Sequence, residues 1–466
     1  MIGIVVSRAD EASTHVAEHL LDLVDWRESL DDSRPDAAGG GAVYRHGAFE
    51  LREFDALHLE LDDVADAFSA PPDLVAFASR HSGETGPLLT AHFTGNFGPA
   101  EYGGAANAVA AAAPGAQAAL VESFDAYAPE GYEVGMECTH HGPTDVGCPS
   151  LFVELGSGET EWRDPAGAAA VARAILDLAA LDADGSEGSS GERAGGSERS
   201  VMGARTVVGF GGGHYVPRFE RVVRETAWTV GHVAADWGLD AMGDPGDHRD
   251  VIEAAFAASG AEHALVEGSR PALEAVVADL GYRVVSETWL RAVGDRDLAV
   301  VAAVEAELGA VADGVRFGDR RIDGGDDSDG DDDWVVRSLP DDLLEAARAV
   351  DADRTRSLVE RETVAFGTRN GGSQVSGRGA FPDDDAYDAL VDGLVDVLEP
   401  EYDDVRRADG RVVATKDAFD PRRAHQEGVP EGPKFGRLAN GEPVEVDGER
   451  IDPDDVTTHQ EDVFDV

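Results

Sequence analysis

Nine consecutive residues, Glu137-Cys138-Thr139-His140-His141-Gly142-Pro143-Thr144-Asp145, place carboxylate, thiol, hydroxyl and imidazole groups side by side. They follow a strand-like segment, 132–136, and Gly142-Pro143 predicts a turn that directs these side chains into a cleft. Either histidine could serve as a general base, because the unperturbed pKa of histidine lies near neutrality. Both histidines and Cys138 could also contribute to a zinc site. The alternative is a pair of hydrogen-bonded histidines that only hold the loop.

A second candidate loop lies in the segment Gly209-Phe210-Gly211-Gly212-Gly213-His214-Tyr215-Val216-Pro217-Arg218-Phe219. Its glycines would let a substrate approach closely, and their N–H groups can point at an anion. His214 stands where the dinucleotide-binding fingerprint requires its last glycine, and the chain has neither a P-loop lysine motif nor a nucleophile elbow. We expect the two loops to meet at one site. The alternative is a structural glycine turn.

Three further histidines lie at the ends of predicted strands or within them. His81 follows the predicted strand 74–78, His92 lies within 88–94, and His232 follows Gly231. Each taken alone is more often a hydrogen-bonded buried histidine than a ligand. Their positions favour a shared site, because sites in α/β folds form at strand ends.

The composition is strongly acidic. The 466 residues include 93 acidic and 38 basic residues, for a net charge of −55, and the only lysines are Lys416 and Lys434. Such a chain would repel itself at low salt, so we expect the cytosol of an extreme halophile. The charge disfavours binding of nucleic acid by a basic patch, so such binding would depend on shape, hydrogen bonds and local arginines.

Two cysteines, Cys138 and Cys148, are too few for a disulfide framework. A disulfide, a metal site and two free thiols all remain open. The first residues form an apolar run only one strand long, so no signal peptide is expected, and no apolar run reaches membrane length.

Strand-like and helix-like segments alternate along the first 310 residues and predict an α/β fold, a layered sheet with helices on both faces. The predicted strands include 2–7, 57–61, 74–78, 88–94, 151–155, 206–210, 229–234, 263–267 and 283–290. The predicted helices include 10–24, the Ala-rich segment 107–127 with a break at Pro114-Gly115, and 165–181, 219–227, 250–259, 271–280 and 298–308.

Composition also divides the chain into domains. We expect a core at 1–310 with a flexible Gly/Ser-rich insertion at 182–200, an acidic linker at 311–333, and a C-terminal α+β extension at 334–466 with helices at 341–350 and 387–398. The acidic run 323–333 lacks the Gly and the final Glu of a calcium-binding loop.

The ordered motifs resemble one known family. Residues 137–144 are similar to the Glu-x-Thr-His-His-Gly-Pro-Thr signature of the archaeal and plant type of D-aminoacyl-tRNA deacylase. Ser79-Arg80-His81, with Leu89-Thr90-x-His92 and Gly95-Asn96, resembles its upstream motif. The glycine-rich stretch 209–219 and Gly231-His232 resemble the third and fourth motifs. The resemblance covers residues 1–310, and Cys138 departs from it, since a small residue is expected there.

This resemblance implies a fold like those of peptidyl-tRNA hydrolase and nucleoside phosphorylase, and hydrolysis of the ester between a D-amino acid, or glycine, and the terminal ribose of tRNA. This is a translation quality-control activity of a cytoplasmic enzyme, expected to be a monomer, whose partner is the charged tRNA. The alternatives are a nucleoside phosphorylase-like enzyme and a non-catalytic tRNA-binding protein.

The resemblance also implies zinc, for which we take four residues as candidate ligands: His81, His92, Cys138 and His232. His140 or His141 would activate water, directly or through zinc, and His214 is a further catalytic candidate. The amides around Gly212 and Gly213 would stabilise the oxyanion or hold the terminal phosphate. The expected substrate contacts come from Thr139, Thr144, Gly211, Tyr215 and Arg218.

The tail carries a second, shorter resemblance. Residues 428–438, with 441–444 and 447–448, look like a segment of ribonuclease Z, but the metal-binding His-x-His-x-Asp-His of that nuclease is absent from this chain. Because both lysines and several arginines lie in or near the tail, we expect it to help hold tRNA. The alternative is a turn-rich packing module.

Overall fold

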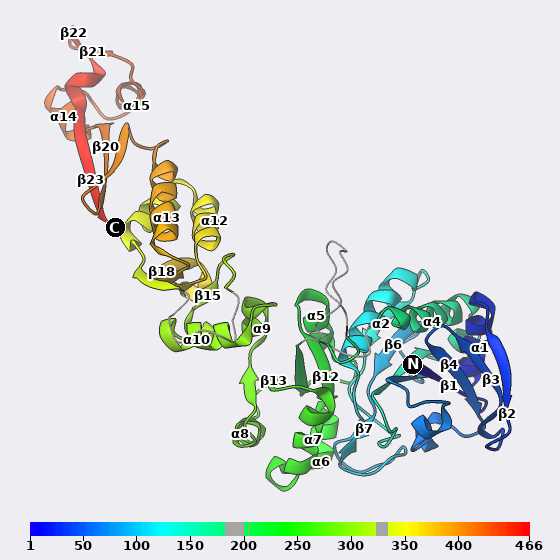
Figure 1. The fold of residues 1–466 in the computed structure, drawn as a ribbon. Coiled ribbons are helices and arrows are strands. Elements are labelled where there is room, and N and C mark those ends of the chain that lie inside the picture. The colour runs from blue at the N-terminus through cyan, green and yellow to red at the C-terminus, as the bar shows by residue number, and fades with distance from the viewer. Residues whose placement is uncertain (182–199, 204, 323–333) are drawn as a thin grey trace. The chain divides into compact units, whose positions relative to one another are not determined.

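A computed structural model describes residues 1–181, 200–203, 205–322 and 334–466 (Figure 1). Contacts divide the chain into two units, Met1–Gly294 and Asp295–Val466. The expected insertion lies outside the described residues except for Ser200, and so does the acidic run 323–333 of the expected linker.

The large sheet of the first unit is built around three parallel strands that are almost wholly buried, which explains their continuous apolar runs. These are β1 (Ile2–Ser7), β5 (Leu74–Arg80) and β10 (Ser150–Gly156). The strand order is β2-β3-β4-β1-β5-β10-β6-β9, and the sheet is mixed because β6 runs antiparallel to β10. The remaining strands are β2 (Arg27–Asp31), β3 (Ala38–His46), β4 (Phe49–Phe54), β6 (Leu88–His92) and β9 (Glu133–Met136).

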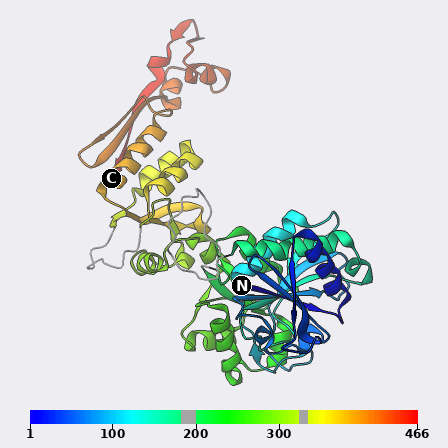
Figure 2. The same cartoon turned by 45° about the vertical axis from the view of Figure 1, so that its right-hand side comes forward.

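Three helices, α1 (Glu11–Leu23), α2 (Pro114–Tyr127) and α4 (Pro165–Asp177), pack on one face of this sheet (Figure 2). Buried alanines on all three allow close packing. The carboxylates of Asp10 and Asp164 cap α1 and α4. The other face is covered by coil and short turns, where Val146 packs on Phe77 and Phe152. Among the described residues of this unit, helices therefore cover both faces only in the second sheet.

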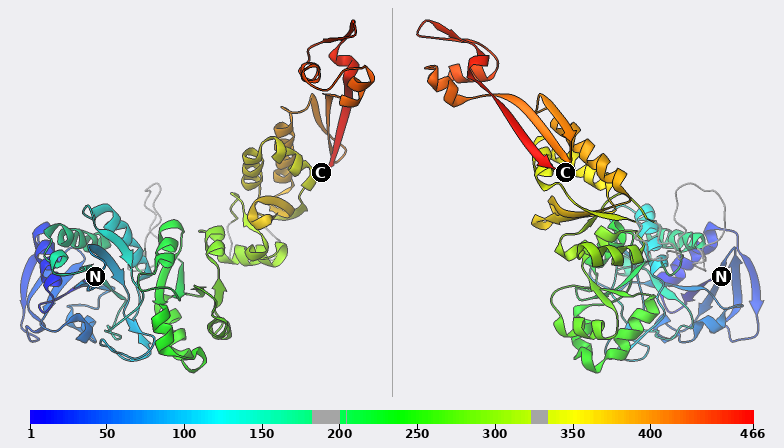
Figure 3. Two further views of the ribbon diagram at one scale, coloured as in Figure 1. Left: turned by 180° about the vertical axis from the view of Figure 1, so that it is seen from behind. Right: turned by 60° about the vertical axis from the view of Figure 1, so that its left-hand side comes forward.

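The second sheet is fully parallel, with the order β12-β11-β13-β14, formed by β12 (Thr229–Ala234), β11 (Thr206–Phe210), β13 (His263–Val266) and β14 (Arg283–Val285). One face packs against α6 (Asp236–Met242), α7 (Arg249–Ser259) and α8 (Pro271–Asp279). The other face carries α5 (Pro217–Glu225) and α9 (Glu287–Val293). Figures 1 and 3 show α5 and the α6–α7 pair on opposite sides of β12. The α/β prediction is confirmed.

Three local expectations were wrong. The helix expected at 107–127 with a break at Pro114-Gly115 begins only at Pro114, and the segment before it contains the short strand β8 (Ala108–Val109). The segment 57–61 forms a 3-10 turn, His58–Glu60, in place of a strand. The strand expected at 283–290 ends at Val285, because the Ser286 hydroxyl accepts the Trp289 N–H and starts α9. The smaller elements of this unit are β7 (Gly95–Asn96), β8 (Ala108–Val109) and α3 (Glu159–Trp162).

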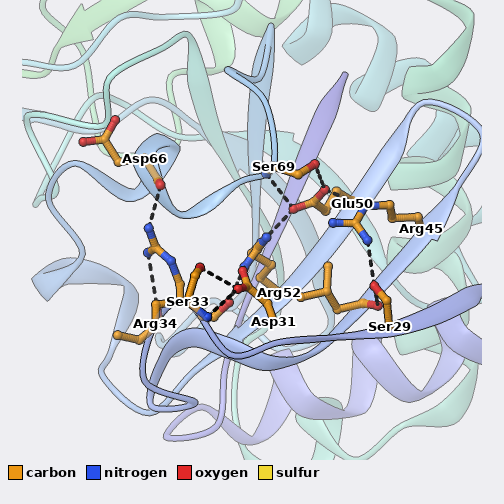
Figure 4. A network of polar contacts seen from close by, with 12 residues as sticks. Ser29, Asp31, Ser33, Arg34, Arg45, Glu50, Arg52, Asp66 and Ser69 are labelled. Carbon is orange, nitrogen blue, oxygen red and sulfur yellow. Dashed lines mark hydrogen bonds and ion pairs between the residues drawn. The ribbon is translucent and has the colours of Figure 1, made fainter.

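A buried ionic network joins the antiparallel strands at one edge of the large sheet (Figure 4). The Arg52 guanidinium donates to Glu50 and to Asp31, each at 2.7 Å. Glu50 also accepts from the N–H of Ser69 at 3.0 Å and from Arg45 at 2.8 Å. A buried carboxylate is tolerated here because both of its oxygens have donors.

The second unit begins with α10 (Leu298–Leu308), whose Val300 and Val304 pack against Trp334 and Ala380. This packing explains why the chain divides at Gly294 and not near residue 310. A four-stranded antiparallel sheet, β15-β17-β18-β16, packs with three helices. Its strands are β15 (Arg316–Phe317), β16 (Val335–Ser338), β17 (Ala365–Arg369) and β18 (Gln374–Phe381), and the helices are α11 (Asp341–Val350), α12 (Ala352–Glu362) and α13 (Asp384–Leu398).

The rest of the second unit is a three-stranded sheet and a small terminal cluster. The sheet consists of β19 (Asp404–Ala408), β20 (Arg411–Phe419) and β23 (Thr457–Asp465). The cluster contains α14 (Pro421–Gln426), α15 (Pro433–Ala439), β21 (Val444–Val446) and β22 (Glu449–Ile451). No helix in the described parts of the chain is long and apolar enough to cross a membrane.

Candidate functional site

The loop that follows β9 turns sharply at the double histidine. His141 has a left-handed backbone, with φ of 46°, and its carbonyl accepts the Gly95 N–H at 2.8 Å. The next residue has to be glycine, because a Cβ on Gly142 would lie 2.3 Å from the nitrogen of Gly104. The Gly142 N–H donates to the carbonyl of Tyr102 at 2.9 Å. The loop is thus held against the segment 98–106.

The same loop is hydrogen-bonded to the second sheet. The N–H of Cys138 donates to the His214 carbonyl at 2.8 Å, and the N–H of Thr139 donates to the Val233 carbonyl at 2.9 Å. The structure therefore brings the double-histidine loop and the glycine-rich loop together.

In the glycine-rich loop, Gly211 and Gly212 have φ of 98° and 85°, which side chains rarely adopt. Their N–H groups donate to the Ala234 carbonyl and to the Asp236 carboxylate, each at 2.8 Å. These two amides are committed to the fold, which corrects the expectation that Gly211 and Gly212 bind an anion or an oxyanion. Gly213 is the remaining candidate of the three.

We call His81, His92, His140, His141 and His214, together with Glu137 and Cys138, the histidine cluster. The buried Glu137 carboxylate lies at its centre. One carboxylate oxygen is 2.6 Å from Nε2 of His214 and 3.8 Å from Nε2 of His140, and the other is 3.9 Å from Nε2 of His81. Three separate segments of the chain therefore present imidazoles to one carboxylate.

Glu137 and His214 form a charged pair. Burial by itself raises the pKa of Glu137, but the His214 hydrogen bond and the nearby histidines outweigh it and lower that pKa well below its usual range. Burial by itself lowers the pKa of His214, but its contacts with Cys138 and Glu137 raise it to about 10. The Cys138 sulfur is 3.6 Å from Nδ1 of His214.

His140 and His141 are neutral at neutral pH. Burial and the nearby His92 hold the pKa of both well below the usual histidine value. Nδ1 of His140 lies 2.9 Å from the Cys138 carbonyl, and Nδ1 of His141 lies 2.7 Å from the Gly142 carbonyl. Because a carbonyl only accepts, each Nδ1 carries the proton and each Nε2 keeps a free lone pair.

His92 has the same arrangement, with Nδ1 3.1 Å from the Phe93 carbonyl. Its ring centroid lies 4.1 Å from that of His140 and 4.8 Å from that of His141. Its Nε2 is 3.5 Å from a carboxylate oxygen of Glu154 on β10. Burial raises the pKa of Glu154. For His92, the carboxylates of Glu154 and Glu137 outweigh the effect of burial and raise its pKa. Both shifts favour binding of a proton by the His92–Glu154 pair, and a bound cation would displace that proton.

The donor set of the cluster fits a metal ion. Three groups have ligand atoms within 4.8 Å of one another: His92 with His140 and His141; Cys138 with His140 and His214; and His81 with Glu137 and Glu154. Within the described chain, Nδ1 of His81, Nε2 of His92 and one oxygen of Glu137 are buried without a hydrogen-bond partner. Buried polar atoms without partners are rare, and a bound water or ion is one way in which such atoms are satisfied.

Two expected site residues have structural roles instead. Nε2 of His232 donates to the Ala110 carbonyl at 2.8 Å, and its Nδ1 is 2.9 Å from the Thr139 hydroxyl. Thr139 also accepts the Val233 N–H at 3.1 Å. Burial lowers the pKa of His232 to about 4. With both ring nitrogens engaged, His232 is not a ligand, and Thr139 has no hydroxyl proton left for substrate.

Arg218 and Thr144 also support the framework. The Arg218 guanidinium donates to the Val266 carbonyl at 3.0 Å and lies 3.5 Å from Glu287, so part of its hydrogen-bonding capacity is used within the fold. Thr144 accepts the Ala105 N–H at 2.8 Å, which fixes the segment 98–106. Tyr215 does belong to the site, because its hydroxyl is 3.2 Å from Nε2 of His81.

Glu137 and Glu154 were missed as site residues by sequence reasoning. A signal existed for Glu154, which interrupts the apolar run of β10, since a glutamate is almost never fully buried without a partner. Glu137 carries no comparable signal, because it directly follows β9 and does not interrupt an apolar run.

Comparisons with known proteins match the part of the chain that contains this site. The family model described as D-aminoacyl-tRNA deacylase matches residues 68–285, a range that contains the whole histidine cluster. The D-aminoacyl-tRNA deacylase of Halorubrum lacusprofundi is 54% identical, over 100% of this chain and 96% of that protein. That of Natronomonas pharaonis is 50% identical over 98% of each chain.

More distant relatives extend the comparison. The D-aminoacyl-tRNA deacylase of Methanococcoides burtonii is 31% identical over 97% of this chain and 94% of its own. The crystal structure of AF0625, a conserved protein of unknown function, is 28% identical with a TM-score of 0.51, and the match covers 62% of this chain and 96% of that one. With these identities over nearly the full length, the chain belongs to the D-aminoacyl-tRNA deacylase family.

Proposed function

We propose that the histidine cluster hydrolyses the ester between a D-amino acid and the terminal ribose of tRNA, releasing the free amino acid and tRNA. Membership of the deacylase family supports this reaction. The observation that carries the assignment to these residues is the Glu137 carboxylate, whose oxygens lie within 4 Å of imidazole nitrogens from three segments. The proposed substrates are D-Tyr-tRNA, other D-aminoacyl-tRNAs and glycyl-tRNA, and the proposed setting is the cytosol, with the chain acting as a monomer.

We further propose that His92, His140 and His141 would hold a zinc ion through Nε2. The support is that each has its Nδ1 on a main-chain carbonyl, the arrangement by which proteins orient metal-binding histidines. Zinc would supply a Lewis acid and a water of lowered pKa. Cys138, an expected ligand, is then left to contact His214.

The remaining residues of the cluster would orient one another and accept the proton that the attacking water loses. The unpartnered oxygen of Glu137 accepts a proton from the attacking water. Cationic His214 holds the other oxygen, so the carboxylate keeps one orientation throughout the reaction. The hydroxyl of Tyr215 orients His81, whose Nε2 lies 3.9 Å from the Glu137 carboxylate.

The test is hydrolysis of D-Tyr-tRNA at molar KCl by the wild type and by His140→Ala and His141→Ala. We expect each variant to lose activity by about 100-fold or more, because each removes a proposed ligand of the zinc ion that would lower the pKa of the attacking water. His19→Ala on α1, outside the cluster, is the control and should keep full activity. Metal content before and after chelation tests zinc separately.

Wild-type rates in both His140→Ala and His141→Ala would reject the assignment of the reaction to this cluster. Binding of D-Tyr-tRNA by the wild type without any hydrolysis would reject the enzyme and support a non-catalytic tRNA-binding protein.

A further inference from the structure

Three exposed aromatic side chains border the histidine cluster. Across the described residues, only Tyr102, Tyr215 and Trp237 among the large aromatics are exposed, at 68%, 36% and 51%. The chain has 17 Phe, 8 Tyr and 6 Trp, so exposure of an aromatic ring is uncommon here. Scattered exposed apolar residues need no explanation, but a group confined to one site does.

Each of the three is tied to a loop of the cluster. The Tyr102 carbonyl accepts the N–H of Gly142, the residue after the double histidine. Trp237 follows Asp236, which accepts the Gly212 N–H at 2.8 Å and returns its own N–H to the Gly212 carbonyl at 2.9 Å. Tyr215 contacts His81 directly.

The segments that carry Tyr102 and Trp237 also touch each other. A Cβ added to Gly98 would lie 3.0 Å from a backbone carbon of Ala241 on α6. Figure 1 shows the chain after β7 beside this helix. Tyr102 and Trp237 are therefore carried on segments that pack against each other.

Phosphate binding has little support in this region. The first unit has no lysine. Arg218 is engaged by Glu287 and Val266, and Arg270 donates to Asp236 at 2.5 Å. In molar salt the Debye length is about 3 Å, so charge attraction to phosphates is largely screened. Stacking of bases on aromatic rings does not depend on charge in this way.

We propose that Tyr102, Trp237 and Tyr215 form a stacking surface for the unpaired nucleobases at the 3′ end of the tRNA. This inference rests on the proposed function, since the ester lies at that end. Each stacked base strengthens binding by about 5- to 100-fold, enough to replace several screened phosphate contacts.

The test compares Trp237→Ala and Tyr102→Ala with the conservative Trp237→Phe and Tyr102→Phe in D-Tyr-tRNA hydrolysis at molar KCl. We expect the alanine variants to raise KM about 5-fold or more with kcat unchanged, because they remove binding far from the reacting atoms. The phenylalanine variants should stay close to the wild type. Leu30→Ala, at a residue 75% exposed on β2, is the matched surface control.

A second measurement uses a single-stranded oligonucleotide that has the sequence of the tRNA 3′ end and carries no amino acid. It should quench tryptophan fluorescence in the wild type and not in Trp237→Phe, and the same sequence in a duplex should quench neither. Unchanged KM and quenching in both alanine variants would overturn the stacking surface. So would a change of oligomeric state in these variants, which would identify the patch as a contact between copies.

The hydrolysis assay and the fluorescence measurement together separate this inference from the proposed function. If the wild type binds and quenches but does not hydrolyse D-Tyr-tRNA, the proposed reaction fails while the stacking surface stands. If hydrolysis is normal in every variant, the reaction stands and the stacking surface fails.

Discussion

Two histidines of the family motifs, His214 and His232, have opposite pKa shifts for reasons that lie in their neighbours. His214 faces the Glu137 carboxylate and the Cys138 thiol, which raise its pKa to about 10. His232 faces a threonine hydroxyl and a backbone carbonyl, and burial lowers its pKa to about 4. The first is therefore part of the charged site, and the second is part of the core.

His232 should make stability depend on pH. Its folded pKa of about 4 lies below the unfolded value of about 6.5, so protons bind preferentially to the unfolded chain. The contribution is fully present above about pH 6.5 and is lost as the pH falls toward 4, by about 3 kcal/mol in total. His232→Gln keeps a donor for Ala110 and cannot be protonated, so we expect its unfolding free energy to fall less steeply over this range.

Urea unfolding between pH 7 and pH 4 at constant molar salt measures this difference. His58, whose pKa is also lowered to about 4, is present in both proteins and contributes equally to both curves. Parallel curves for the variant and the wild type would show that His232 is not the group that titrates.

The sequence predicted which loops carry the chemistry but not which histidine does which task. His81, His92, His140 and His214 stand at strand ends and are brought together, as the spacing indicated. His232 has the same residue type and a similar position. Its partners come from distant segments, so no local pattern in the sequence could separate it from the others.

The contact between β12 and α7 depends on a glycine. A Cβ on Gly231 would lie 2.3 Å from the side chain of Ser259. The hydroxyl of Ser259 accepts a hydrogen bond from the His232 N–H at 3.0 Å. We expect Gly231→Ala to destabilise the fold by about 1–3 kcal/mol, because the helix must move away from the sheet. Chemical unfolding at molar salt measures this.

Gly238 on α6 is the matched control, since a Cβ there meets no atom within 4 Å. Gly238→Ala should be neutral or stabilising by up to about 1 kcal/mol, because glycine in a helix loses more backbone freedom on folding than alanine. Equal losses in the two variants would contradict the role given to the Ser259 contact.

At the scale of elements, helices with clear end signals and buried parallel strands were predicted well, and the antiparallel strands at one edge of the large sheet were not. Pro165 and Pro271 begin α4 and α8 as their positions indicated. The hairpin strands β2 to β4 had no clear apolar alternation. Their pairing depends on the buried network of Arg52 and Glu50, which only the folded chain reveals.

At the scale of the whole molecule, the charge of −55 sets the conditions under which the fold is stable. Screening falls as salt is removed, since the Debye length grows from about 3 Å at 1 M to about 10 Å at 0.1 M. We expect the thermal midpoint to fall as KCl is lowered, and activity to be lost with it. A midpoint that does not change with KCl would show that repulsion is not limiting.

The tail does not present a free basic surface along its strands. Lys416 pairs with Glu401, Arg407 with Asp388, and Arg411 with Asp465. These pairs reduce the charge available to phosphates, so the expected contact between the tail and tRNA stays a prediction that the pairing makes weaker.

Both thiols of the chain are protected from oxidation, each in a different way. Cys138 is buried against the charged ring of His214, out of reach of dissolved oxidants. Cys148 is partly exposed, but burial raises its pKa to about 12, so it stays in the unreactive thiol form. We therefore expect both thiols of the folded enzyme to react with oxidants more slowly than an ordinary surface thiolate, and to lose this protection on unfolding.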